Sequence, residues 1–162
     1  MSYTRKGTKA QVLQSKSLRV LRGHLRRDGD GTVRGMDEAP EETLYDRVGG
    51  LAFFVDLVSR FYEGVSDDEF LGPMYPEEDH GPAIERLALF LAQYWGGPPT
   101  YSELRGHPRL RMRHDPYKIT KKARDAWLGL MLGAVDEMEM DPADRADLVA
   151  YLDLAAHQLR NR

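Results

Sequence analysis

The sequence predicts an all-α domain. Apolar residues recur at steps of three and four in four segments, no segment alternates as a half-buried strand would, and glycine and proline clusters separate the segments. With 162 residues, 41% of them hydrophobic, the chain suffices for one packed core. Its long, non-repetitive loops argue against a simple up-and-down bundle, so we expect four main helices joined by irregular connections.

The first long helix is expected around residues 53–65, after a short opening helix that Gly49 and Gly50 end. Asp56, Arg60 and Glu63 fall on its polar face. The apolar residues share the opposite face: Phe53, Phe54, Leu57, Val58, Phe61, Tyr62 and Val65. A loop-rich passage with three prolines, SDDEFLGPMYPEEDHGP, follows this helix from Ser66 onward.

The second long helix is expected between Pro82, which suits a first helical turn, and the breaker sequence Gly96–Pro99. Its apolar stripe comprises Ile84, Leu87, Phe90, Leu91, Tyr94 and Trp95. About twenty residues of irregular sequence come next, including GHPRLRMRHDPYKI at residues 106–119.

Two further helices complete the predicted domain. Thr120 can cap the N-terminus of the third helix. The fourth should begin with Asp141 as its N-cap and Pro142 at the first helical position. The apolar face of the third is Ala123, Ala126, Trp127, Leu130, Met131, Ala134, Val135 and Met138. The apolar face of the fourth is Ala146, Val149, Leu152, Ala156 and Leu159.

Charge separates a basic N-terminal extension, residues 1–42, from the domain at residues 43–162. Residues 1–36 carry nine Lys or Arg against two Asp, and the remainder carries fourteen against twenty-four acidic residues. We interpret the extension as disordered. Two alternatives are a basic amphipathic helix for nucleic acid or a membrane surface, and an upstream start codon before Met36. No stretch resembles a membrane span or a secretory signal, which predicts a cytoplasmic protein.

The stretch at residues 106–119 carries the most distinctive chemistry. Cysteine is absent, so a metal would need ligands such as histidine. Pro116 should end any short helical turn at Asp115, which places His114 at a helix end. The surrounding cations suit a ligand with an apolar body and carboxylates, and haem is such a ligand. A solvated basic loop or a phosphate-binding patch is the alternative.

Polar-tipped aromatic residues support the haem interpretation. Tyr62 and Trp127 lie in apolar stripes where Phe or Leu would need no hydrogen-bond partner, and Tyr75 lies in the loop between the first two long helices. Each could be an ordinary core aromatic. Together they could donate hydrogen bonds to a small bound ligand.

The chain resembles the group II truncated haemoglobins from about Leu44 to the C-terminus. The resemblance rests on LYDRVGG, SRFYEGV, PMYPEED, the tryptophan in RDAWL, and ERLALFLAQYWGGPPTYSELRGHPRLRMRH. It implies a two-over-two helical sandwich, a truncated globin fold. The basic extension lies outside the family pattern.

The resemblance also implies residue roles. His114 would be the proximal ligand of a haem b iron, and Tyr62, Tyr75 and Trp127 would be the distal polar residues. The other expected haem contacts are Ala83, Arg86, Leu87, Phe90, Tyr101, Arg111, Met112 and Arg113. Asp115 could reach the free N–H of the proximal imidazole, although a backbone carbonyl is the expected partner.

The function expected from the resemblance is binding of O₂ and other small ligands such as NO, CO or peroxide. Three distal donors would hold O₂ tightly, which suits sensing, storage or redox chemistry better than oxygen transport. The sequence leaves open a peroxidase-like or nitric oxide dioxygenase-like activity, an unknown electron donor and a homodimer. The alternatives are a helical interaction module with a nucleic-acid-binding tail, which the acidic domain disfavours, and a metal hydrolase using His107 and His114.

Overall fold

The computed structural model describes residues 40–162 except residue 77. Within this range Glu42–Arg162 forms a compact unit. The predictions made for the N-terminal extension, both disorder and the alternative of a basic amphipathic helix, concern residues that lie almost entirely outside the described part of the chain.

The first half of the domain contains helices α2 and α3 and a short 3₁₀ turn. Helix α2 spans Leu44–Arg47, α3 spans Leu51–Asp67, and the turn η1 spans Gly72–Met74. Thr43 and Asp46 form a reciprocal capping box at the start of α2. Gly49 and Gly50 have φ values of 96° and 81°, a region that favours glycine, which explains why a glycine pair separates α2 from α3.

The second half contains five helices. Helix α4 spans Gly81–Tyr94, α5 spans Thr100–Arg105, α6 spans Leu110–His114, α7 spans Lys121–Asp136 and α8 spans Pro142–Leu159. The Thr120 side chain accepts from the backbone N–H of Ala123, as its predicted capping role requires. Helix α6 ends at His114, one residue before the position that Pro116 restricts. The expectation that residues 100–119 are irregular was wrong for α5 and α6, which are too short to show a clear period.

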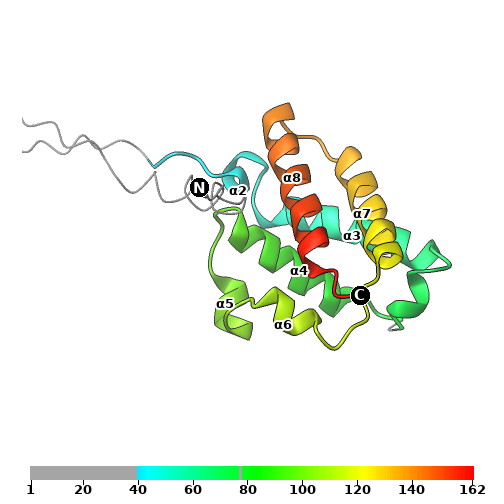
Figure 1. Cartoon of the computed structure of the whole chain (residues 1–162). Coiled ribbons are helices and arrows are strands. Elements are labelled where there is room, and N and C mark those ends of the chain that lie inside the picture. The colour runs from blue at the N-terminus through cyan, green and yellow to red at the C-terminus, as the bar shows by residue number, and fades with distance from the viewer. Residues whose placement is uncertain (1–39, 77) are drawn as a thin grey trace, which may run out of the picture. The chain divides into compact units, whose positions relative to one another are not determined.

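The helices pack as two pairs, α3 with α4 and α7 with α8, and α3 also packs against α7 (Figure 1). The short helices α5 and α6 follow α4, and α6 packs on α8. This is the predicted two-over-two arrangement. The described residues contain helices and turns but no strand.

The core confirms the periodicity of α3. Its buried residues are Phe53, Phe54, Leu57, Val58, Phe61, Tyr62 and Val65, the predicted apolar face. In α7, Met131, Ala134 and Val135 are buried, whereas Ala126 and Trp127 are half-buried. Burial at this scale contributes roughly 1.5–3 kcal/mol for each large apolar side chain.

Two predicted faces needed correction. In α4, Tyr94 is 48% exposed and stacks on Tyr151 of α8 at 3.9 Å between ring centroids. In α8, Ala146 is exposed, whereas Leu148 and Asp144 are buried. The deep face of α8 is therefore rotated toward Leu148, Leu152 and Ala156. Asp144 can occupy it because Arg47 donates to both of its carboxylate oxygens, and this pairing lowers the Asp144 pKa.

Candidate functional site

The three predicted distal residues form a contiguous cluster. The rings of Tyr62 on α3 and Tyr75 after η1 meet edge to face with centroids 5.8 Å apart. The Trp127 side chain on α7 is hydrogen-bonded to Tyr75, and since an indole can only donate, its N–H points to the phenol oxygen. The Phe61 ring packs against two members of this cluster. Its centroid lies 5.0 Å from that of Tyr62 and 5.3 Å from that of Trp127. Residues from three separate segments thus converge.

The electrostatics of the cluster keep Tyr75 neutral. Burial and the neighbouring Tyr62 raise the pKa of Tyr75 to about 12, against a smaller opposing effect of the Trp127 hydrogen bond. At neutral pH the phenol therefore retains its proton. A neutral phenol both accepts from Trp127 and has its own O–H to donate.

His80 also belongs to this region, although no pattern in the sequence predicts a role for it. Its ring centroid lies 5.0 Å from that of Tyr62, and its Nδ1 lies 3.4 Å from the hydroxyl of Ser66. The residue immediately precedes α4, whereas Tyr62 is on α3. No local pattern could signal the contact, because it depends on how the two helices cross.

His114, the predicted metal ligand, lies at the C-terminal end of α6 and is half-buried. Its Nδ1 is 2.8 Å from the backbone carbonyl oxygen of Leu110. Since a carbonyl only accepts, Nδ1 must carry the proton, and Nε2 then holds the lone pair that a metal would need. The expected backbone partner is confirmed, in preference to Asp115.

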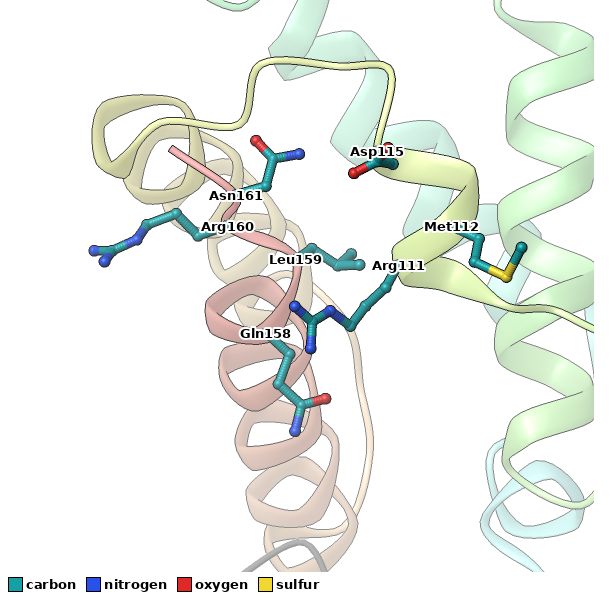
Figure 2. A pocket seen from close by; sticks show the side chains of 7 residues that line it. All are labelled: Arg111, Met112, Asp115, Gln158, Leu159, Arg160 and Asn161. Atoms are coloured by element: carbon teal, nitrogen blue, oxygen red, sulfur yellow. The ribbon is translucent and has the colours of Figure 1, made fainter.

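The cations near His114 differ in how they are engaged. Arg113 donates from Nε to the carbonyl of Pro108 at 2.8 Å and from Nη2 to that of Arg105 at 2.7 Å. Arg111 and Met112 line a pocket of about 300 Å³ between α6 and the end of α8. Figure 2 shows Arg111 extending toward Gln158, while Met112 points away from α8. Within the segment, Arg113 braces the loop and Arg111 is exposed.

The remaining predicted contacts lie on α4 and α5. Ala83 and Leu87 are half-buried, and Phe90 packs edge to face on Tyr101 at 5.5 Å. Arg86 and Tyr101 line a second pocket of about 140 Å³ between these helices. The structure therefore brings together the distal trio, and separately Arg86 with Tyr101, but their roles toward a cofactor remain predictions.

The metal-hydrolase alternative has little geometric basis. His107 accepts at Nδ1 from the backbone N–H of Arg109, 3.3 Å away, so this nitrogen is engaged in holding the loop. Across residues 40–162 without residue 77, no group of three or more His, Asp and Glu side chains is placed to hold a metal ion. Over the same residues, no helix is both long and apolar enough to cross a membrane.

The sequence matches a known family and curated relatives. The model of the bacterial-like globin family matches residues 43–161. Group 2 truncated hemoglobin YjbI of Bacillus subtilis is 41% identical over 124 residues, covering 76% of this chain and 89% of the relative. Two-on-two hemoglobin-3 of Arabidopsis thaliana is 31% identical over 149 residues, covering 83% and 85%.

Solved structures agree with that match. A thermostable hemoglobin from Thermobifida fusca is 57% identical with a TM-score of 0.72, covering 74% of this chain and 98% of that one. A truncated oxygen-avid haemoglobin from Bacillus subtilis is 37% identical with a TM-score of 0.69, covering 74% and 100%. The interaction-module alternative therefore has no support. This chain belongs to the group II truncated haemoglobins of the bacterial-like globin family and is a haem-based ligand-binding protein.

Proposed function

We propose that the protein binds O₂ and related diatomic ligands at a haem b whose iron is ligated by His114. The donor set fits such a group, because the hydrogen bond from His114 Nδ1 to Leu110 leaves Nε2 as the ligating atom. Ferrous haem supplies an iron that binds O₂ reversibly and donates electron density to it. The chain's own residues then determine how tightly the ligand is held.

The walls and charges around this site suit a porphyrin. Ala83 and Leu87 on α4 offer half-buried apolar surface, and Met112 is 67% exposed, a large apolar area that a bound porphyrin would cover. The proposed propionate contacts are Arg86, Arg111, Tyr101 and the Nη1 group of Arg113, whose Nε and Nη2 already donate to backbone carbonyls. Arginine suits this role because its planar fork matches a carboxylate.

The single observation that carries the proposal is the convergence of Tyr62, Tyr75 and Trp127. These side chains can donate to a ligand that carries partial negative charge, and a charge-assisted hydrogen bond contributes roughly 1.5–3 kcal/mol. At 1.4 kcal/mol for each tenfold, one such bond slows ligand loss by about ten- to a hundredfold. Tight retention favours oxygen sensing, storage or redox chemistry over transport.

An enzymatic variant uses the same residues. The three donors could polarise peroxide or a nitrogen oxide, giving peroxidase-like or nitric oxide dioxygenase-like turnover with an electron donor from the cytoplasm. The neutral state of Tyr75 supports this role, since its pKa of about 12 keeps its proton available for donation at neutral pH.

The proposal is tested by the visible spectrum of the haem-loaded protein. We expect an intense Soret band and an iron–histidine stretching band in the ferrous state, and loss of the latter in His114→Gly. Adding imidazole to that variant should restore a histidine-type spectrum. His107→Gly is the matched control and should resemble the wild type. An iron–histidine band that persists in His114→Gly would contradict the assigned ligand.

A further inference from the structure

We propose that Asn161, which follows the end of α8 by two residues and lies 47 positions after His114 in the sequence, is a positioning residue for the proximal ligand. This inference rests on the proposed role of His114. Asn161 contacts the backbone carbonyl of His114. It acts through the backbone of the segment that carries His114.

The contacts of Asn161 form a clamp on residues 114–119. Its Nδ2 donates to the carbonyl of His114 at 3.2 Å and to that of Tyr117 at 2.8 Å. Its Oδ1 accepts from the N–H of Ile119 at 3.0 Å, and its own backbone N–H donates to the carbonyl of Ile119 at 3.1 Å. One side chain therefore satisfies backbone groups at three positions, namely the last residue of α6 and two residues of the non-helical segment that follows it.

The segment needs this support because α6 is weakly held by itself. The helix has five residues and none of them is buried. So short a helix is marginal without tertiary contacts. Pro116, in the turn after His114, has no N–H to donate. The carbonyl of His114 is instead satisfied from two sides, by Tyr117 N–H at 3.1 Å and by Asn161.

The geometry links the clamp to the imidazole. The His114 ring is fixed by Nδ1 to Leu110 at one end of α6, and the His114 backbone is fixed by Asn161 at the other. Without the clamp the last turn of α6 could rotate, and the angle of Nε2 to an iron would vary. Asn161 thereby couples the C-terminus to the strength and uniformity of the proximal bond.

Two substitutions separate the donor role from simple packing. Asn161→Asp preserves size and can still accept from Ile119, but it places a carboxylate against two carbonyls and removes both donations. Asn161→Ala removes all side-chain bonds. Gln158→Ala is the matched control, because Gln158 lines the same pocket and, in the described part of the chain, makes no hydrogen bond to residues 114–119 (Figure 2).

The readouts are the iron–histidine stretching band in the ferrous protein and the rate of haem transfer to apomyoglobin. For both Asn161 variants we expect a shifted, broadened band and haem loss about tenfold faster or more, because Asn161→Asp removes two hydrogen bonds and Asn161→Ala removes three. Gln158→Ala should match the wild type in both. Helical circular dichroism should be unchanged, which would separate this effect from unfolding.

The outcomes distinguish this inference from the proposed function. An unchanged band and haem-loss rate in both Asn161 variants of a His114-ligated protein would overturn the positioning role alone. Loss of helical structure in both variants would also overturn it, since Asn161 would then be needed for the fold. A band that persists in His114→Gly would overturn the proposed function and this inference together.

Discussion

The two sides of the proposed site are built by different means. On one side, Tyr62 and Phe61 belong to a helix face that is buried in the core, and Trp127 packs on Phe61. On the other side, α6 buries no residue, and His114 is held mainly by hydrogen bonds to and from backbone groups. Side-chain packing thus positions the proposed distal donors, and backbone anchoring positions the proposed proximal ligand.

This difference predicts different sensitivities. A packed side chain can be displaced only by creating a cavity, which costs several kcal/mol of stability. A backbone-anchored segment loses about 1 kcal/mol for each hydrogen bond removed, but its geometry changes locally. Distal core substitutions should therefore reduce global stability, whereas proximal ones should alter the site first.

Phe61→Ala should have the largest effect. Phe61 is 1% exposed and contacts both Tyr62 and Trp127, so its truncation should reduce the free energy of unfolding by about 3–5 kcal/mol. Denaturant unfolding of the haem-loaded protein measures this loss. Val55→Ala on the exposed face of α3 is the control and should change little. A loss below about 1 kcal/mol would contradict the packed distal side.

Alkaline pH should have the second largest effect, a reduction of the free energy of unfolding through Tyr75 on the distal side. The folded pKa of Tyr75 is raised to about 12 from an ordinary value of 10.0, so the unfolded state loses this proton first. The stabilisation is intact below pH 10 and declines between pH 10 and 12, by roughly 2–3 kcal/mol for Tyr75. The pH dependence of unfolding measures it.

Burial also raises the pKa of Tyr151, so the total alkaline loss includes more than one tyrosine. Subtracting the profile of Tyr75→Phe isolates the share of Tyr75. Equal slopes for wild type and Tyr75→Phe above pH 10 would count against a buried, neutral Tyr75.

Trp127→Phe tests donation on the distal side with little change in packing. The indole N–H donates to Tyr75 and so orients the Tyr75 O–H that can donate to a ligand. Removing the indole N–H should therefore accelerate O₂ dissociation by about ten- to a hundredfold, as the loss of one charge-assisted bond to the ligand predicts. Stopped-flow measurement on the haem-loaded ferrous protein gives the rate. Trp95→Phe is the matched control, because Trp95 Nε1 is buried without a hydrogen-bond partner among the described residues. Equal rates in both variants would exclude Trp127 as the important donor.

Arg113→Ala should have the smallest effect on stability and tests the proximal side. It removes two bonds to the carbonyls of Pro108 and Arg105, and we expect a loss of about 1 kcal/mol because the residue is exposed. Arg111 makes no hydrogen bond or ion pair within the described range, so Arg111→Ala should leave the free energy of unfolding in denaturant unchanged. A larger loss for Arg111 than for Arg113 would reverse the assigned bracing role.

The sequence predicted the buried face of α3 well, because the spacing of apolar residues along a long amphipathic helix shows which side is buried. All seven residues of the predicted α3 face are buried. The same argument failed in part for α8, where Asp144 is buried and Ala146 is exposed. A buried carboxylate interrupts an apolar pattern, and only its pairing with the distant Arg47 makes the position stable.

The proximal side was predicted from chemistry and resemblance, not from period. Pro116 indicated where α6 ends, and the structure agrees. The supporting contacts were not visible, because Asn161 and His114 are 47 residues apart and neither lies in a pattern that pairs them. His80 was missed for the same reason, although its ring lies 5.0 Å from that of Tyr62.

By itself the sequence determined the helical class, the long helices, the cap at Thr120 and the start of α8 after Asp141, although the Asp141 side chain makes no capping hydrogen bond. These features depend on neighbours within one or two helical turns, so local spacing encodes them. The tertiary structure decided the rest: that Trp127 donates to Tyr75, that His80 lies on Tyr62, and that the last residues hold the His114 segment. Such contacts depend on where separate helices cross, and the spacing of residues within one helix does not indicate which distant residues it will meet.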